Sequence, residues 1–342
     1  MASNWEEFYS SQPPPADLND SENLLKTFYS KHVNADTKVV LVTSGGTTVP
    51  LEHNTVRFVD NFSAGTRGSV STEYFLDHGY AVIFMYRVKS LQPFSRHFTG
   101  QKFLNMLDLN ETKEGTSITG NILFSPSEVL CKYKAAIEND KLLEISFTTV
   151  SEYLWLLRSA CQTLAPLKER CILYLAAAVS DFYIPPNEMS VHKIPSTKPQ
   201  TISLHLVPKI LAPLVSLWVP NAFVVSFKLE TDENLLIIKA REALKKYKHK
   251  LVIANMLHAR KRQVTLVTEE NSCAINLTDQ QIAAGEEIEM YIVKDVVQKH
   301  EEFIHHFHPN KGDRCAQKYI ILNTFYLIIM NLLEKKYYGI AE

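Results

Sequence analysis

The stretch Lys-Val-Val-Leu-Val-Thr-Ser-Gly-Gly-Thr-Thr, residues 38–48, decides the fold of this 342-residue chain. It begins with a short, β-branched apolar run, which predicts a buried strand. The glycines that follow stand out because the chain has only 11, and four of them, Gly45, Gly46, Gly65 and Gly68, lie close together. Glycine is found where the backbone turns with positive φ or closely approaches another group.

The second glycine cluster, Asn-Phe-Ser-Ala-Gly-Thr-Arg-Gly over residues 61–68, precedes helical spacing from Val70 to His78. Hydroxyls and bare N–H groups beside glycine suit phosphate oxygens. Strand, glycine loop and helix start therefore predict a nucleotide or phosphate site, although the first cluster is neither GxGxxG nor a P-loop. A second apolar run over 80–86 follows, which indicates a βαβ unit and a parallel sheet.

The rest of the chain alternates in the same way and predicts an α/β fold of layered strands and helices. We expect further strands at 142–150, 171–179, 201–207, 222–227, 250–255 and 264–268, and helices at 125–139, 151–164, 208–219, 234–247 and 288–305.

Composition is that of an ordinary soluble globular protein, with 46% hydrophobic and 21% charged residues and a net charge of −1. No long basic stripe is present, so a dedicated nucleic-acid partner is not expected. The five cysteines are scattered without metal-like spacing, which indicates reduced thiols and a cytoplasmic protein, with the nucleus as the second possibility.

We divide the chain into a polar N-terminal arm over 1–36 that carries one short amphipathic helix around 21–32, a main domain over 37–308 and an apolar C-terminal tail of unknown role over 309–342. The apolar part of that tail, 319–333, is shorter than the roughly 20 residues of a membrane span. A helix packed on the body or at a subunit contact is therefore favoured over attachment to a membrane surface.

Four strand ends carry small or polar residues directly after an apolar run, and parallel sheets bind ligands beyond those ends. Singly, each has an ordinary structural explanation, since Asp often caps a helix and Asn often forms a turn. Together they predict a site rich in backbone amides, which suits phosphoryl or acyl-phosphate chemistry. The strand ends are Ser44–Thr48, Ala176–Ala178 with Ser180 and Asp181, Phe227–Lys228, and Ala254–Asn255.

Several charged residues have two interpretations, a solvent-exposed surface position or a functional role. Lys193 lies in an unpatterned stretch, 183–200, and is either a solvated lysine or part of a mobile flap that brings a cation onto phosphates. Arg57 and Arg67 flank the second glycine cluster and are surface residues or oxyanion ligands. The C-terminal histidines predict no metal site, because the adjacent His305 and His306 point apart on a helix.

Seven motifs, in order between residues 38 and 305, together resemble the phosphopantothenate–cysteine ligase family of coenzyme A biosynthesis, in its eukaryotic stand-alone form. They are residues 42–52, 56–68, 175–183, 192–194, 207–211, 225–232 and 252–255. The resemblance implies a Rossmann-like parallel-core sheet flanked by helices, a smaller dimerisation and flap region, and a homodimer.

The resemblance also implies a reaction in two steps. The carboxylate of 4′-phosphopantothenate attacks the α-phosphorus of a nucleoside triphosphate and releases pyrophosphate, and the amine of L-cysteine then attacks the acyl-nucleotide. ATP is the implied co-substrate, with CTP possible because the match through 239–245 is loose, and Mg²⁺ is implied to neutralise the triphosphate.

Site residues follow from the same resemblance. It implies that Asn61, Ala177, Ala178 and Asp181 bind phosphopantothenate, with Asn61 also catalytic, and that Arg57 reaches a substrate in the neighbouring subunit. Lys193 is the implied flap lysine and, with Asn61, is predicted to be catalytic. The implied nucleotide-binding positions are Gly45, Gly46, Ser63, Gly65, Gly68, Phe227 and Asn255.

Two other functions remain open at this point. An NAD(P)-dependent oxidoreductase would explain the first glycine loop, but Tyr86 and Arg87 stand where an acidic residue would bind the adenine ribose. A non-catalytic scaffold would use the apolar tail.

Overall fold

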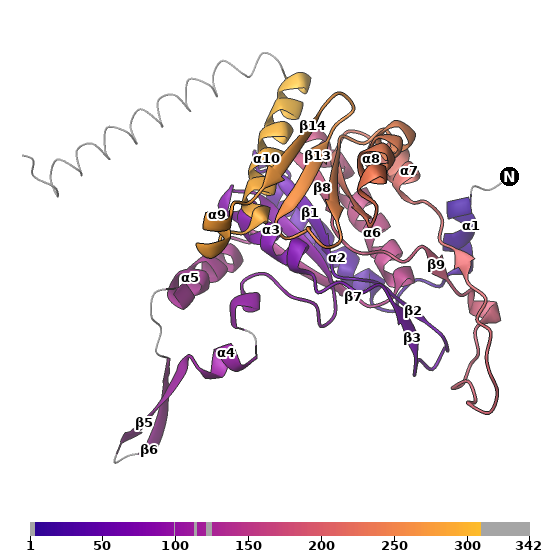
Figure 1. Cartoon of the computed structure of the whole chain (residues 1–342), viewed down its shortest axis with the longest axis horizontal. Helices are drawn as coiled ribbons and strands as arrows, with labels where there is room; N and C mark the ends of the chain where they lie inside the picture. The colour runs from indigo at the N-terminus through magenta and orange to yellow at the C-terminus, as the bar shows by residue number, and fades with distance from the viewer. Residues whose placement is uncertain (1–3, 99, 113–114, 121–124, 309–342) are drawn as a thin grey trace, which may run out of the picture. The chain divides into compact units, whose positions relative to one another are not determined.

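The computed structural model describes residues 4–98, 100–112, 115–120 and 125–308 (Figure 1). Residues up to Val296 belong to one compact unit, and a second unit begins at Val297, within helix α10, Ile288–Phe307. All the candidate site residues belong to the first unit. The tail predicted over 309–342 lies outside the described residues.

The first unit is built on an eight-stranded sheet with strand order β14-β13-β12-β11-β8-β1-β4-β7. Neighbouring strands from β12 to β7 are parallel, and β13 and β14 extend the sheet in the antiparallel sense. The parallel-core α/β prediction is therefore confirmed. The strands are β1 Val39–Ser44, β4 Ala81–Arg87, β7 Leu142–Phe147, β8 Cys171–Leu175, β11 Phe223–Glu230, β12 Leu251–Met256, β13 Gln263–Val267 and β14 Ser272–Asn276.

The continuous apolar runs are explained by burial on both faces of the sheet. In β1, Val39 and Leu41 belong to the core cluster shared with α6, whereas Val40 and Val42 are equally buried but lie outside that cluster. Alternate residues of a strand point to opposite faces, so a strand covered on both sides needs apolar residues throughout. This is the pattern that predicted the sheet.

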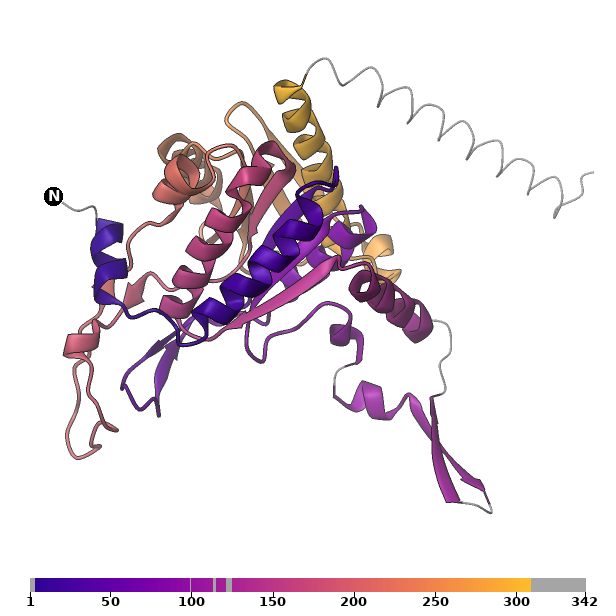
Figure 2. The same cartoon turned by 180° about the vertical axis from the view of Figure 1, so that it is seen from behind.

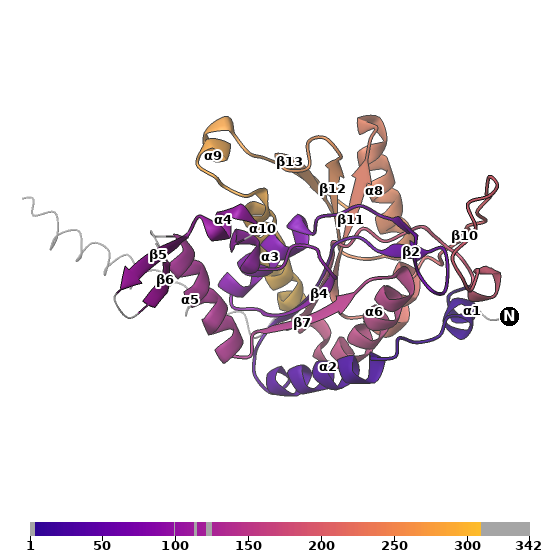
Figure 3. The same ribbon diagram turned by 90° about the horizontal axis from the view of Figure 1, so that it is seen from below.

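Helices cover the two faces of this sheet. Helices α2, Leu18–His32, and α6, Val150–Leu164, pack together on one face, whereas α3, Thr66–Asp77, packs on β1 and β4 on the other (Figures 2 and 3). The remaining helices are α1 Asn4–Ser11, α4 Gln101–Leu104, α5 Ser125–Glu138, α7 Leu211–Pro213, α8 Glu233–Tyr247 and α9 Asp279–Ala283.

Local chemistry fixes where α6 begins. Thr149 accepts a hydrogen bond from the Glu152 N–H while the Glu152 carboxylate accepts one from the Thr149 N–H, which forms a capping box. This box ends β7 at Phe147, so the strand predicted over 142–150 is shorter than expected. Similarly, β8 ends at Leu175, and the alanines after it form a loop.

The helix predicted around residues 21–32 of the polar N-terminal arm is present as α2, and the arm also contains α1, which was not predicted. Phe8 and Tyr9 of α1 are buried, as are Leu25 and Phe28 of α2, and all four join the main core cluster. The Tyr9 hydroxyl donates to the Leu154 carbonyl at 2.7 Å. This segment is therefore packed into the core of the first compact unit.

Three small two-stranded sheets accompany the main one, namely β2 Thr48–Pro50 with β3 Phe58–Asp60, β9 Phe182–Tyr183 with β10 His205–Leu206, and β5 Leu107–Thr112 with β6 Gly115–Gly120. The strand predicted over 201–207 shrinks to β10. The helix predicted over 208–219 becomes α7 and a π-helical turn, Leu214–Trp218, because Pro213 cannot continue a regular helix. Within the described ranges, no helix is long and apolar enough to cross a membrane.

Candidate functional site

The first glycine loop connects the carboxyl ends of β1 and β8. Gly45 has φ +82°. Its carbonyl accepts a hydrogen bond from the Ala178 N–H at 2.8 Å, and the Ala178 carbonyl accepts one from the Thr47 N–H at 3.0 Å. The two strand ends predicted from sequence to form one site are therefore joined by main-chain hydrogen bonds.

The second glycine cluster forms the start of α3. Gly65 caps this helix with φ +81°, and its N–H donates to the Ser63 hydroxyl at 3.3 Å. A β-carbon on Gly68 would lie 2.4 Å from Cβ of Ser44, so only glycine lets α3 approach β1 this closely. The helix N-terminus with its unpaired N–H groups is a site where an anion binds well.

Asn61 is the first residue of the second glycine cluster and lies next to the first. It is half-buried, and its N–H donates to the Thr47 carbonyl at 3.1 Å. The Thr47 hydroxyl also accepts a hydrogen bond from the Ser180 N–H at 2.9 Å. Thr47 thus holds Asn61 and the loop before Asp181 in one place. The strand-end pattern predicted residues 44–48 as part of the site, but it gave no individual role to Thr47.

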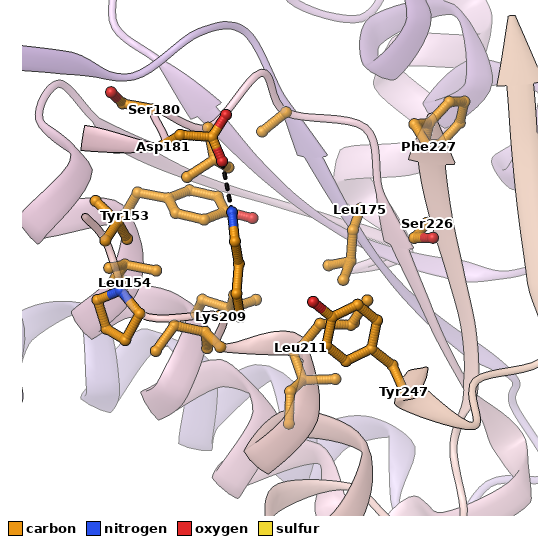
Figure 4. A pocket seen from close by; sticks show the side chains of 17 residues that line it. Tyr153, Leu154, Leu175, Ser180, Asp181, Lys209, Leu211, Ser226, Phe227 and Tyr247 are labelled. Atoms are coloured by element: carbon orange, nitrogen blue, oxygen red, sulfur yellow. Dashed lines mark hydrogen bonds and ion pairs between the residues drawn. The ribbon is translucent and has the colours of Figure 1, made fainter. Parts of the chain in front are cut away.

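A cavity of about 300 Å³ lies below these strand ends, between β8, β11, α6 and α7 (Figure 4). Ala177 and Asp181 of the predicted substrate set line it together with Phe227 of the predicted nucleotide set. Asp181 forms an ion pair with Lys209 at 2.6 Å, and both side chains are more than half exposed. Lys209 belongs to a motif recognised in the sequence but was not predicted as a site residue.

Two of the predicted nucleotide residues lie on neighbouring strands. Phe227 of β11 pairs in register with Ile253 of β12, and its ring meets that of Tyr174 edge to face at 5.0 Å. Asn255 follows on β12 and is 7% exposed. Both residues lie toward the carboxyl ends of their strands, on the side of β8 away from β4.

The predicted flap is tied to the β2–β3 segment through one buried carboxylate. Glu52 accepts hydrogen bonds from Arg57 Nε at 2.9 Å and Nη2 at 2.7 Å, and from the Ile194 N–H at 3.4 Å. Burial would raise the pKa of Glu52, but these hydrogen bonds outweigh it and lower the pKa to about 2. Arg57 Nη2 also donates to the Ile194 carbonyl at 2.7 Å.

These contacts show which of the positively charged residues predicted from sequence are already paired within the protein. Arg57 is held by Glu52, and Lys193, directly before Ile194, is exposed to solvent. Arg67 forms an ion pair with Glu289 at 2.9 Å and donates to the Arg260 carbonyl, so its position is structural. The structure therefore brings Asn61, the glycines, Ala178 and Asp181 together, and leaves the roles of Arg57 and Lys193 as predictions.

Comparison with known proteins agrees with this geometry. The DNA/pantothenate metabolism flavoprotein C-terminal domain family matches residues 149–299. The chain is 45% identical to the human phosphopantothenate–cysteine ligase, over 78% of this chain and 88% of the relative. It is 40% identical to the ligase CAB2 of Saccharomyces cerevisiae, over 88% of this chain and 87% of the relative.

Solved structures give the same result. A Cab2 variant in complex with phosphopantothenate-cysteine has a TM-score of 0.80 at 39% identity, covering 88% of this chain and 99% of that one. The DNA/pantothenate metabolism flavoprotein of Streptococcus pneumoniae has a TM-score of 0.52 at 19% identity, covering 80% of this chain and all of that one, and so shares the fold. None of these relatives supports the oxidoreductase alternative.

Proposed function

This chain belongs to the phosphopantothenate–cysteine ligase family, and from that premise we propose how its site performs the reaction. It is an enzyme of coenzyme A biosynthesis that joins 4′-phosphopantothenate to cysteine. The observation that carries this function is the close match to ligases of several eukaryotes along most of both chains.

The proposed chemistry activates a carboxylate, because a carboxylate is a poor electrophile and its oxygen a poor leaving group. An oxygen of the phosphopantothenate carboxylate bonds to the α-phosphorus of a nucleoside triphosphate, and the bond to pyrophosphate breaks. The cysteine amine then attacks the acyl carbon, loses a proton, and releases the nucleoside monophosphate. The protein supplies positioning and charge stabilisation for both steps.

Asn61 is the proposed catalytic residue. Its amide orients the carboxylate and stabilises the acyl-nucleotide, while phosphate oxygens bind the N–H groups at the Gly45–Gly46 loop and the start of α3. Support comes from the position of Asn61, which begins the second glycine cluster, lies next to the first and is fixed by the Thr47 carbonyl. Preorganised donors of this kind need no rearrangement during the reaction.

We place phosphopantothenate beside Ala177, Ala178 and Asp181. Ala177 and Asp181 line the same cavity as Phe227, so the acid and the nucleotide can meet there. Lys209 adds a positive charge beside Asp181. Because their ion pair is exposed and contributes little to stability, polar groups of the substrate can replace either partner in it.

The proposed nucleotide is ATP, with CTP as the alternative, bound at Gly45, Gly46, Ser63, Gly65, Gly68, Phe227 and Asn255. Mg²⁺ would neutralise part of the triphosphate charge. No group of three or more metal-ligating side chains occurs in the part of the chain that the structure describes. Mg²⁺ would be bound chiefly by phosphate oxygens of the nucleotide and by water, as is usual for this ion.

We also propose a homodimer. Large apolar side chains are exposed on β3, just after it and on β10, namely Phe58 at 49%, Phe62 at 84% and Leu206 at 68%. Exposed apolar side chains that gather in a patch commonly mark an interface. Arg57 lies on the same hairpin, where a partner subunit would bring its substrate within reach, and Lys193 would close over the phosphates from the flap.

The proposed location is the cytoplasm, with the nucleus as the alternative. Cys131, Cys161, Cys171 and Cys273 are all free thiols, as expected in a reducing compartment. Fluorescence imaging of a tagged full-length chain would test this location.

Pyrophosphate release, measured with ATP and CTP side by side, tests the function. Release should require phosphopantothenate, and the amide product should require cysteine. Asn61→Ala should leave the melting temperature unchanged and lower product formation by at least ~100-fold. Wild-type turnover by the Asn61→Ala variant would contradict the assigned role, and absence of pyrophosphate release with either nucleotide would contradict the function.

A further inference from the structure

The loop that follows β4, residues 87–92, packs against both glycine clusters. A β-carbon on Gly45 would lie 2.8 Å from Cβ of Arg87 and 3.0 Å from the hydroxyl oxygen of Ser90. A β-carbon on Gly65 would lie 3.1 Å from the same hydroxyl oxygen. The Leu91 N–H donates to the Ala64 carbonyl at 2.9 Å. This loop therefore forms a further wall of the glycine cradle, by which we mean residues 44–48 and 61–68, and the sequence pattern did not predict it.

A cavity of about 520 Å³ lies along this wall. Ser63 and Ala64 from the glycine cluster form one side, and the loop 87–92 forms the other, with Asp60, Phe62, Ser95 and Arg96 at its margin. It is distinct from the 300 Å³ cavity beside Asp181, because the two share no lining residue. Their common neighbour is the glycine cradle.

The charges around this cavity single out Lys89. Arg87 is neutralised by Asp60, with N–O distances of 2.8 and 2.9 Å. Arg96 is held by Glu73 and Glu287 at 2.7 and 2.6 Å. Lys89 is exposed, and no carboxylate of the described chain pairs with it. Its φ of +71° is uncommon for a residue with a side chain.

The strand order gives this cavity a role. The proposed nucleotide positions Asn255, Phe227 and Gly45 lie on or beside β12, β11 and β1, and the order across the sheet is β12-β11-β8-β1-β4. Adjacent strands are about 4.8 Å apart, so four intervals span roughly 19 Å, comparable to an extended nucleoside triphosphate. A base near Asn255 and an α-phosphorus beside Asn61 leave the β- and γ-phosphates directed toward the end of β4.

We propose that the cavity between Ser63 and the 87–92 loop holds the β- and γ-phosphates, and hence the leaving pyrophosphate, with Lys89 as its cationic partner. When the bond between the α-phosphorus and the bridging oxygen breaks, the electron pair remains on pyrophosphate. The Lys89 side chain stabilises that developing charge, and Ser90 and the Ser63 hydroxyl provide further hydrogen-bonding groups. This inference rests on the proposed ligase function and adds a residue to it.

Binding of Mg²⁺–pyrophosphate to the full-length protein tests the inference without requiring turnover. Calorimetric titration of the Lys89→Met variant should show at least ~10-fold weaker binding of pyrophosphate than wild type, and Lys89→Arg should restore most of it. The matched control is Lys134→Met on α5, another exposed lysine. Melting temperatures of all three variants should equal that of wild type, because both lysines are exposed.

Kinetics separate the two proposals. In the ligase assay, Lys89→Met should raise the KM for nucleotide and the inhibition constant of pyrophosphate by ~10-fold or more, while inhibition by nucleoside monophosphate is unchanged. Wild-type pyrophosphate affinity in Lys89→Met would overturn this inference and leave the ligase function standing. An inactive wild-type enzyme would overturn the proposed function, whereas the titration would still decide whether Lys89 binds pyrophosphate.

Discussion

Gly46 lies so close to the main chain of Asn61 that a β-carbon on Gly46 would be 1.6 Å from the Asn61 carbonyl oxygen. Any side chain at position 46 would force the main chain at Asn61, directly after β3, to move. Unlike Gly45 and Gly65, Gly46 has no positive φ, so the requirement for glycine comes from space and not from backbone conformation. The absence of a side chain on Gly46 thus positions Asn61, the proposed catalytic residue.

Gly46→Ala should therefore displace Asn61 and lower kcat/KM by at least ~100-fold, since a misplacement of about 1 Å at a reacting group has an effect of this size. The variant should still fold, because the sheet core is unaffected. Steady-state kinetics and circular dichroism measure the two effects.

The matched control is Gly79→Ala. Gly79 has φ +80°, but a β-carbon there would have no neighbour within 4 Å. The variant should lose about 1 kcal/mol of stability from backbone strain and keep its activity. Equal kcat/KM values for Gly46→Ala and wild type would show that the close approach has no catalytic consequence.

Glu52→Gln should loosen the flap. The substitution keeps the size of the side chain but places an NH₂ group among the donors of Arg57 and Ile194. Limited proteolysis within 183–200 should become faster, and the KM for phosphopantothenate should rise ~10-fold with a smaller change in kcat. Glu188→Gln, which alters an exposed ion pair with His205 in the same region, should change neither quantity.

The pH dependence of this flap follows from the same residue. The pKa of Glu52 is lowered from 4.5 to about 2, so its stabilising contacts are complete above about pH 4.5 and are lost only as the pH falls toward 2. The rate of proteolysis within 183–200 should therefore be constant from pH 5 to 8 after correction for the protease. A change within that range would contradict the assigned role of Glu52.

Helix α1 packs against the loop that carries Asp181, a proposed substrate-binding residue. The Phe8 ring meets the Tyr183 ring at 5.0 Å, two residues beyond Asp181, and Phe8 is 2% exposed. Phe8→Ala should cost about 3 kcal/mol of stability and raise the KM for phosphopantothenate more than the KM for nucleotide. Leu156→Ala, a buried change in α6, serves as the control, because it should reduce stability without this selective effect.

The sequence predicted the elements that rely on local pattern. Buried strands such as 38–43 and 80–86 are continuous apolar runs, and the glycine loops bring several distant strand ends to one edge of the sheet. Helix α1 was missed because three prolines, 13–15, and polar neighbours conceal Trp5, Phe8 and Tyr9, whose spacing places them on one helical face.

Contacts between side chains that are far apart in the sequence could not be predicted from the sequence alone. Arg67 has the sequence context of an anion ligand, yet Glu289, more than 200 positions away, engages it. Lys209 joins the site through its ion pair with Asp181, and the Thr47 side chain is linked to Ser180, more than 100 positions away. The antiparallel edge strand β14 has neither a long apolar run nor full burial, so its pattern gave no signal.

The last prediction concerns a buried histidine next to the 300 Å³ cavity. His249 Nε2 lies 2.8 Å from the hydroxyl oxygen of Ser226, which lines the cavity, and Nδ1 has no hydrogen-bond partner. Burial disfavours the charged ring and lowers the pKa of His249 from 6.5 to about 4. The ring is therefore neutral in the folded protein at neutral pH.

Linkage fixes the sign of its effect on stability. Between about pH 6.5 and pH 4 the unfolded chain protonates this histidine and the folded chain does not, so stability falls as the pH decreases. The contribution is fully present above pH 6.5 and lost by about pH 4, a change of about 3 kcal/mol. The glutamine of His249→Gln cannot be protonated, so the variant should lack this pH dependence. Urea unfolding at pH 7.5, 6.5, 5.5 and 4.5 should therefore show that the free energy of unfolding of the variant rises relative to that of wild type as the pH falls. A difference that stays constant over this range would mean that His249 titrates alike in both states and is not the buried neutral ring below Ser226.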